Sequence, residues 1–260
     1  MEDLKIIFEI LSILIIYNSF NDSYYILKIM NNLILVRHGQ SLWNKERRFT
    51  GWADIGLTDQ GMFEAENAGR LIKKLNIVFD SYFTSELTRA KQTLKIILKI
   101  LEKQKVNITK STAFNERHYG NLTGLNKDET IKKYGTEQVQ LWRRSFDIAP
   151  PPMSKDHPFK NKINSHILGE SLKETFDRVV PYYKKNVEPL VASKKNIIIV
   201  LHGNSIRALL MKIFNISKKK IDKFEIPTGN PLLIRFADKL NIKDYKYLNK
   251  KRAKKILFNV

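Results

Sequence analysis

Two short runs of apolar, β-favouring residues constrain the fold of this chain more than any other feature. They are LILV at 33–36 and NIIIVL at 196–201, and neither run alternates polar with apolar residues. Continuous apolar strands of this length are typical of a parallel sheet that is covered by helices on both faces. Each run leads into a histidine followed by a glycine, at His38 and at His202. The pattern predicts two buried strands whose carboxyl ends both present an imidazole.

Helical patterns alternate with the strand-like runs along the chain. Apolar residues at helical spacing predict helices at 58–75, 86–102, 128–134, 137–145, 171–187 and 203–214. Thr58 is the expected N-cap of the first helix. Further strands are expected at 80–84 and 231–236. Because strands and helices alternate, the sequence predicts an α/β fold, a three-layer α/β/α sandwich with a mostly parallel central sheet.

The first thirty residues differ in character from the rest. Residues 4–17 are strongly apolar, but this stretch is too short to span a bilayer comfortably and it contains Glu9. Acidic residues precede it, whereas a signal peptide begins with positive charge. We expect 1–30 to be an N-terminal extension, either an accessory helix or residues upstream of a true start near Met30, with no membrane anchor. Residues 31–260 are long enough for one sizeable core.

Composition excludes some chemistries and leaves others open. The chain has no cysteine, so disulfides, thiolate nucleophiles and cysteine-bound metals are excluded, and no metal site is expected. The net charge of +20 would attract polyanions such as nucleic acid or anionic lipid. A coding bias toward lysine is the favoured explanation, because only 12 of the 46 basic residues are arginine. No stripe of lysine and aromatic residues supports a nucleic-acid partner.

The two histidines suggest phosphoryl transfer. A neutral imidazole at His38 can attack phosphorus if a backbone carbonyl holds the proton on its other nitrogen. Arg37 and Arg89 follow strand ends and can neutralise phosphoryl oxygens, and a protonated His202 would complete a cationic cage. Glu116, in a polar and aromatic stretch, is the candidate proton donor and acceptor, with a pKa expected to rise beside a phosphate. Each of these residues alone is also compatible with a structural role.

Longer motifs carry a family resemblance. The stretches RHGQSLWN, FTGW, TSELTRA, NERHYG, GLNK, EQVQLWRRSF, GESL, HGNSIRAL and IPTGNPL occur in order from about Leu33 to Tyr247. In these motifs and in their order, the chain resembles the cofactor-dependent phosphoglycerate mutases of the histidine phosphatase superfamily. RHG and HG alone would indicate only the superfamily, whereas NERHYG, GLNK and WRR are typical of the mutases. The resemblance makes 31–260 a phosphoglycerate mutase-like catalytic domain.

The resemblance implies a reaction and a set of residues. The reaction is the interconversion of 3-phosphoglycerate and 2-phosphoglycerate through a phosphohistidine at His38, with 2,3-bisphosphoglycerate as the priming cofactor and no metal. The implied catalytic residues are His38, Glu116, His202, Arg37 and Arg89. The implied substrate-binding residues are Arg37, His38, Gly39, Gln40, Ser41, Leu42, Trp43, Asn44, Thr50, Gly51, Arg89, Glu116, Arg117, His118, Tyr119, Lys127, Arg143, Arg144, Gly203 and Asn204. By the same resemblance, a cytoplasmic homodimer acting on a small phosphorylated three-carbon acid is expected.

Three departures from the family pattern keep other reactions open. Gln40 stands where many relatives have glutamate, the stretch between 156 and 169 is short, and residues 249–260 lack the usual tail rich in glycine and lysine. In relatives that tail helps to close the site, so a poorer lid would favour hydrolysis over transfer. A phosphatase or a bisphosphoglycerate synthase therefore stays an alternative, and a basic nucleic-acid-binding or membrane-binding protein is a third.

Overall fold

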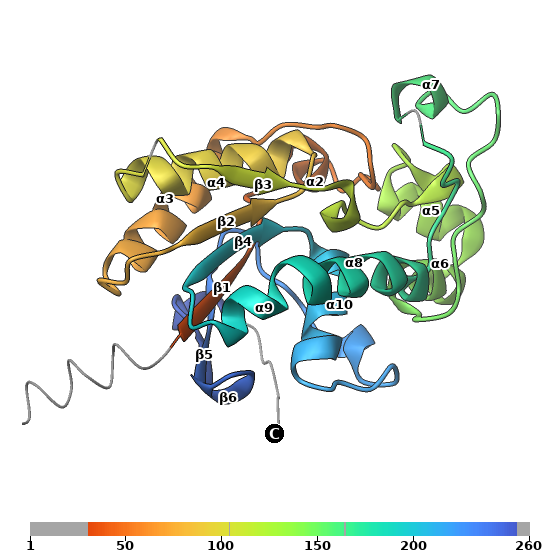
Figure 1. Ribbon diagram of the computed structural model, residues 1–260. Coiled ribbons are helices and arrows are strands. Elements are labelled where there is room, and N and C mark those ends of the chain that lie inside the picture. The colour runs from red at the N-terminus through yellow and green to blue at the C-terminus, as the bar shows by residue number, and fades with distance from the viewer. Residues whose placement is uncertain (1–30, 104, 164, 254–260) are drawn as a thin grey trace, which may run out of the picture.

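A mixed sheet runs through the centre of the molecule and has helices on both of its faces (Figure 1). The computed structural model describes residues 31–103, 105–163 and 165–253. Within them the sheet has six strands in the order β3-β2-β4-β1-β5-β6. Their bounds are β1 (Asn31–Arg37), β2 (Ser81–Thr84), β3 (Ile108–Lys110), β4 (Ile197–Leu201), β5 (Leu232–Asp238) and β6 (Asn241–Tyr247).

The helices form two layers and one separate group. On one face lie α3 (Asp59–Lys73) and α4 (Thr88–Ile100), and on the other α8 (Leu172–Asn186), α9 (Glu188–Ala192) and α10 (Gly203–Ile213). The helices α5 (Lys127–Tyr134), α6 (Thr136–Arg144) and α7 (Lys160–Ile163) lie together beyond one end of the sheet (Figure 1). The one-turn helix α2 (Leu42–Lys45) follows β1 closely. The predicted three-layer α/β/α sandwich is confirmed.

Strand β1 shows why the apolar runs do not alternate with polar residues. Leu33 and Leu35 pack toward α8 and α10, whereas Ile34 and Val36 pack toward α3 and α4, and each is at most 1% exposed. Successive side chains of a strand point to opposite faces, so a strand between two helical layers must be apolar throughout. Each such side chain contributes about 1.5 to 3 kcal/mol by its burial.

The order of strands brings the two His-Gly ends together. Strands β1 and β4 are parallel neighbours, with Arg37 opposite Leu201. The residues that follow them, His38 and His202, therefore leave the same edge of the sheet side by side. The backbone N–H of His38 donates to the carbonyl oxygen of Leu201 at 2.9 Å. This juxtaposition follows directly from the parallel pairing that the sequence predicts.

The sheet is mostly parallel, but one strand is reversed. Strand β5 runs antiparallel to both β1 and β6, so five of the six strands point the same way. The strands β3 and β6 were not predicted. Both lie at sheet edges, where one face or both meet solvent, so their sequences ITK and NIKDYKY lack the long apolar run that identifies a central strand.

Glycines let the loop after β1 pack closely on the start of α3. Thr58 caps that helix as expected, because its hydroxyl accepts from the backbone N–H of Gly61 at 3.1 Å. A Cβ on Gly61 would lie 2.0 Å from the carbonyl oxygen of Gln40, and one on Gly39 would lie 2.1 Å from the carbonyl oxygen of Gly61. Neither backbone has room to move, so only glycine is compatible with this contact. The contact fixes the loop that begins at His38.

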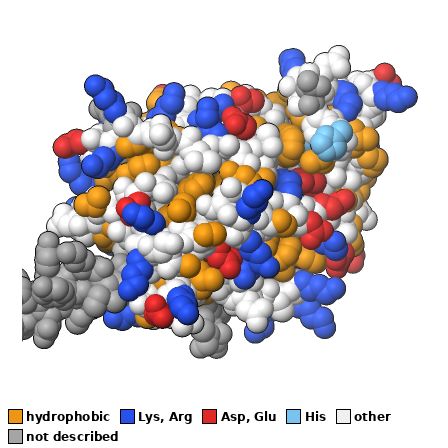
Figure 2. All heavy atoms as spheres, in the orientation of Figure 1, with side chains coloured by type: hydrophobic (Ala, Val, Ile, Leu, Met, Phe, Trp, Pro, Cys, Tyr) orange, Lys and Arg blue, Asp and Glu red, His pale blue; other side chains and the backbone are white. Residues whose placement is uncertain are grey.

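The structure tests the expectations about the two ends of the chain and about its basic charge only in part. Residues 1–30, the expected N-terminal extension, and residues 254–260, the end of the stretch that lacks the usual tail, lie outside the described residues. Within the described ranges no helix is long and apolar enough to cross a membrane. On the face shown in Figure 2, lysine and arginine side chains are scattered among acidic and apolar ones and form no continuous basic stripe.

Candidate active site

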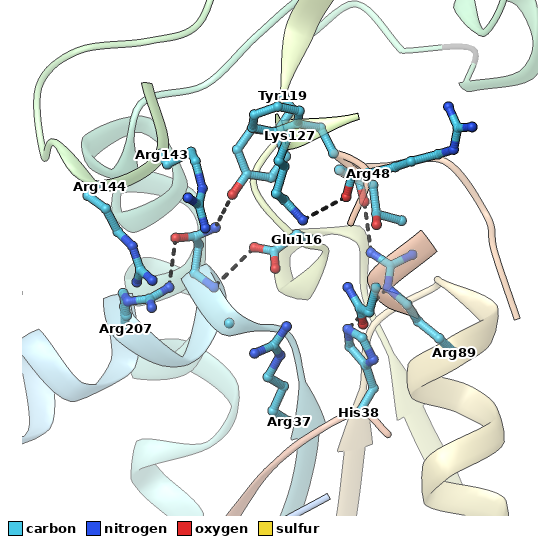
Figure 3. Close-up of a pocket in the computed structure, with 16 residues that line it drawn as sticks. Arg37, His38, Arg48, Arg89, Glu116, Tyr119, Lys127, Arg143, Arg144 and Arg207 are labelled. Atoms are coloured by element: carbon cyan, nitrogen blue, oxygen red, sulfur yellow. Dashed lines mark hydrogen bonds between the residues drawn. The ribbon is translucent and has the colours of Figure 1, made fainter. Parts of the chain in front are cut away.

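A cavity opens at the carboxyl ends of β1 and β4, between the sheet and the group formed by α5 and α6. Residues from the end of β1 and from the segments that follow β1 and β3 line it together with residues of α2, α4, α5, α6 and α10. Figure 3 shows Glu116 near its centre, with His38 and Arg37 on one side and Tyr119 and Lys127 across from them. The lining residues are Arg37, His38, Asn44, Arg48, Phe49, Thr50, Gly51, Arg89, Glu116, Tyr119, Lys127, Arg143, Arg144, Gly203, Asn204 and Arg207.

The imidazole of His38 is held as a neutral nucleophile. Its Nδ1 lies 2.7 Å from the carbonyl oxygen of Gly39, and Nε of Arg89 donates to its Nε2 at 3.2 Å. A carbonyl only accepts and a guanidinium only donates, so the proton is on Nδ1 and the lone pair is on Nε2. Burial and the charges of Arg89 and Arg37 hold the pKa of His38 well below its usual value. The predicted carbonyl contact, which places the proton on Nδ1 and the lone pair on Nε2, is therefore present.

The second histidine lies beside the first. The ring centroids of His38 and His202 are 5.0 Å apart, and His202 is fully buried. Its Nε2 lies 2.7 Å from the hydroxyl of Ser85, while its Nδ1 has no partner among the described residues. Burial and the neighbouring charges of Arg89, His38 and Arg37 lower the pKa of His202 well below the usual value. Protonation of His202, which would complete the cationic cage, thus requires a bound anion, because the surrounding arginines favour the neutral ring.

Glu116 is buried and yet ionised. Its Oε1 accepts from the backbone N–H of Arg117 at 2.8 Å and from that of Asn204 at 3.1 Å. Burial alone would raise the pKa of Glu116, but these hydrogen bonds and the charges of Arg89 and Arg37 outweigh it and lower the pKa. The expected upward shift applies to a carboxyl beside a bound phosphate, so it stays a prediction for the occupied site. The resting carboxylate is ready to accept a proton.

Carbonyl groups, rather than carboxylates, hold the two arginines nearest to His38. Arg37 donates to the oxygen of Ile226 at 2.8 Å, and Arg89 donates to the oxygens of Ala53 and Gly51 at 3.0 and 2.8 Å. Carbonyl dipoles fix the orientation of a guanidinium without cancelling its charge. Of the side chains that line the cavity in the described part of the chain, Glu116 alone is acidic. The cavity is therefore strongly positive and suited to a polyanion.

The outer wall adds further cations. Lys127 donates through Nζ to the carbonyl oxygen of Arg48 at 2.8 Å, and burial together with nearby arginines lowers its pKa to about 8. Arg143 and Arg144, at the end of α6, lie across the cavity from Arg89 (Figure 3). Neutralisation by an anionic ligand would raise the pKa of Lys127 again. This wall lies apart from His38, so it suits the far end of a ligand whose near end meets His38.

Most predicted site residues line the cavity, and the structure places the others outside its lining. Leu42 is 47% exposed at the start of α2, and Trp43 packs edge-on against Phe159. Ser41 caps α2, and the hydroxyl of Thr58 donates to the Gln40 side chain at 3.0 Å. The other predicted residues that do not line it are Gly39, Arg117, His118 and His202, which lie directly behind lining residues.

Three lining residues were not predicted, namely Arg48, Phe49 and Arg207. The guanidinium of Arg48 pairs with Glu46 at 2.8 Å, so this residue contributes mainly its backbone. Arg207 belongs to the HGNSIRAL motif, so this motif was the sequence feature that could have identified it as a site residue. A fourth residue, Arg178, lies outside the cavity and donates to the carbonyl oxygen of Glu116 at 2.8 Å while pairing with Glu170 at 2.6 Å. No sequence signal pointed to Arg178.

Burial of neutral histidines predicts a loss of stability in mild acid. The pKa values of His38, His202 and His118 lie below the ordinary 6.5, that of His118 at about 4, chiefly because of burial. As the pH falls through 6.5 the unfolded chain therefore binds protons before the folded chain does, and stability declines. Between about pH 7 and pH 5.5 each histidine should cost about 1 kcal/mol. Urea unfolding at both pH values measures this loss of stability. The loss should be smaller by about a third in His202→Asn. Equal free energies of unfolding at the two pH values would contradict the prediction.

Comparison with known proteins places this fold and site in a family. The family model of the histidine phosphatase superfamily (branch 1) matches residues 33–243. The structure resembles the alpha-ribazole phosphatase from Shigella flexneri (TM-score 0.66, 20% identity, 86% of this chain and 98% of that chain). It also resembles the phosphoglycerate mutase from Bacillus anthracis str. Sterne (TM-score 0.59, 22% identity, 84% and 91%). These structural likenesses support the fold.

Curated relatives are much closer in sequence. The 2,3-bisphosphoglycerate-dependent phosphoglycerate mutase of Elusimicrobium minutum (strain Pei191) is 43% identical over 238 residues, 88% of this chain and 96% of the relative. That of Buchnera aphidicola subsp. Schizaphis graminum (strain Sg) is 47% identical over 227 residues, 84% and 99%. The chain belongs to the histidine phosphatase superfamily. Within it, the chain is a member of the 2,3-bisphosphoglycerate-dependent phosphoglycerate mutase family.

Proposed function

We propose that this protein is a glycolytic and gluconeogenic phosphoglycerate mutase that interconverts 3-phosphoglycerate and 2-phosphoglycerate through a phosphohistidine at His38. One observation carries the proposal at the level of chemistry. The Nδ1 proton of His38 is held by the carbonyl of Gly39, so Nε2 faces the positive cavity as a nucleophile beside an ionised Glu116. The membership of the mutase family supports the substrate.

The proposed roles follow from the contacts. A substrate hydroxyl attacks the phosphorus on Nε2 of His38, so that an O–P bond forms, the N–P bond breaks, and the hydroxyl proton passes to Glu116. In the return step Nε2 attacks the other phosphoryl group, the O–P bond breaks, and Glu116 returns the proton to the leaving oxygen. Arg37, Arg89 and a His202 that is protonated in the presence of the dianion neutralise the transferring group.

The outer cations suit the demands of a mutase. A bisphosphorylated ligand must stay bound while it turns, so its far phosphate and its carboxylate need a second cationic region. Lys127, Arg143 and Arg144 provide such a region across from His38. The cofactor 2,3-bisphosphoglycerate would supply the phosphoryl group that primes His38, and the uncompensated arginines fit its high negative charge. By family, a homodimer in the cytoplasm is proposed.

A coupled assay tests this function. Conversion of 3-phosphoglycerate is followed through added enolase, with and without 2,3-bisphosphoglycerate. We expect a rate that depends on 2,3-bisphosphoglycerate, because the unphosphorylated His38 must be primed before the first turnover. Phosphate release and formation of 2,3-bisphosphoglycerate are measured on the same preparation. Phosphate release that exceeds isomerisation would assign the protein to the phosphatases, and a rate independent of the cofactor would contradict the priming step.

A further inference from the structure

Arg207 of α10 has an unusual combination of partners at the edge of the cavity. Its side chain is buried, and its Nε and Nη2 donate to the carbonyl oxygen of Phe224 at 3.0 and 2.7 Å. Its Nη1 donates to Oδ1 of Asn204 at 3.1 Å. A guanidinium has donors and no acceptor, so it can face only the oxygen of the Asn204 amide. Arg207 therefore determines which way that amide points.

The orientation of Asn204 in turn determines the role of Tyr119. With Oδ1 held by Arg207, Nδ2 of Asn204 lies 3.3 Å from the phenol oxygen of Tyr119 and must donate to it. Nη2 of Arg117 lies 3.5 Å from the same oxygen and is also a donor. Neither neighbour can accept the Tyr119 proton. Tyr119 lines the cavity, so its hydroxyl proton is free to be donated to a ligand there.

We propose that Arg207 is a positioning residue that sets the hydrogen-bond polarity of Asn204 and Tyr119, so that Tyr119 offers its proton to an anionic oxygen of the ligand. The inference rests on the proposed function and specifies how the ligand's far end is recognised. Tyr119 lies on the side of Glu116 away from His38 (Figure 3). A group that only accepts, such as a carboxylate or a phosphate oxygen, suits this position, whereas a hydroxyl gains less.

A simpler alternative is that Arg207 contributes only its positive charge. Arg144 provides the matched control, because it also lines the cavity and also donates to the carbonyl oxygen of Phe224, at 3.4 Å. Among the contacts of the described residues, Arg144 has none with the Asn204 amide, in contrast to Arg207. Loss of either arginine removes one charge from the cavity. Only the loss of Arg207 frees the Asn204 amide to turn.

The test is a pair of double-mutant cycles on the full chain. The dissociation constant of 3-phosphoglycerate is measured by calorimetry for Tyr119→Phe in three backgrounds, namely the wild type, Arg207→Met and Arg144→Met. In the wild type and in Arg144→Met, loss of the Tyr119 hydroxyl should weaken binding about tenfold. In Arg207→Met the amide turns and Tyr119 donates to it instead of to the ligand. The same loss should then cost about twofold or less.

Two further outcomes keep the test decisive. An equal cost of Tyr119→Phe in the Arg207→Met and Arg144→Met backgrounds would overturn the proposal and leave only the charge of Arg207. If Arg207→Met does not melt cooperatively, Arg207→Leu replaces it, because leucine also has no donor for Oδ1 of Asn204. A tenfold cost of Tyr119→Phe in that background would also overturn the proposal. Failure of the proposed function is seen separately, as wild-type binding of 3-phosphoglycerate without isomerisation.

Discussion

Replacing His38 with alanine should abolish isomerisation and the phosphorylation of the protein. The substitution removes the nucleophile, and losses of nucleophiles from enzymes of this kind reduce turnover by at least about 10⁴-fold. The imidazole of His38 alone combines an Nε2 that faces the cavity with an Nδ1 that donates to a backbone carbonyl. The coupled assay measures the turnover. Labelling with radioactive 2,3-bisphosphoglycerate, followed by acid treatment, measures the phosphohistidine.

The choice of His38 over His202 follows from their contacts. His38 lines the cavity and a backbone carbonyl fixes the proton on its Nδ1, whereas His202 is not among the lining residues and its Nε2 contacts the Ser85 hydroxyl at 2.7 Å. His166 is exposed and lies outside the cavity, which makes His166→Ala the matched control. That control should keep both turnover and acid-labile label. Label that persists in the His38→Ala protein would assign the phosphohistidine to another residue, and unchanged turnover would remove His38 from the mechanism.

The sequence was sufficient to predict the centre of the site because that centre depends on central strands. Strand segments that lie between two helical layers are apolar on both faces, and this makes 33–36 of β1 and the whole of β4 visible in the sequence. Parallel strands end at the same edge, so His38 and His202 were expected to share one crevice. The 5.0 Å between their rings confirms that expectation. The helical layers were predicted for the same reason, from apolar faces at helical spacing.

Backbone carbonyls explain what the sequence did not reveal. Arg207 is oriented by the carbonyl of Phe224, and Arg178 by its contact with the carbonyl of Glu116, 62 residues away in the chain. Every residue has a carbonyl, so such a partner leaves no trace in the residue types. The edge strands β3 and β6 were missed because solvent permits polar residues there. The expectation that a poorer lid favours hydrolysis stays a prediction, since it concerns residues 249–260, of which 254–260 lie outside the described residues.

The protonation states of the site residues also could not be predicted from the sequence. A protonated His202 and a raised pKa of Glu116 were considered for a site that holds a phosphate, and in the ligand-free site the pKa values of both groups are lowered. Both expectations assumed a phosphate in the cavity. Without it, the uncompensated arginines disfavour a second positive charge on His202 and favour the negative charge on Glu116. The binding of a dianion should therefore bring a proton into the site.

Glu116→Gln should slow phosphoryl transfer by about 10² to 10⁴-fold while ligand binding is kept. Glutamine has the shape of glutamate, and its amide oxygen can still accept from the backbone N–H groups of Arg117 and Asn204. It cannot take up the hydroxyl proton or return it. Rapid-quench measurements of the charging and discharging of His38 would show the effect, and calorimetry with 3-phosphoglycerate would serve as the binding control. Wild-type rates of both steps in Glu116→Gln would exclude Glu116 as the acid and base.

The pH dependence of the two steps should separate the acid role of Glu116 from its base role. Its lowered pKa leaves it ionised at neutral pH in the resting protein, so discharge to a substrate hydroxyl finds the base ready. Charging of His38 needs the protonated form to supply the leaving oxygen with a proton. Between about pH 8 and pH 6, charging should therefore accelerate as the pH falls, whereas discharge should not. Because the pKa of His38 is also lowered, its Nε2 stays available over this range. Glu116→Gln should abolish the pH dependence of charging, and a mutant that retained it would place the proton donor elsewhere in the cavity.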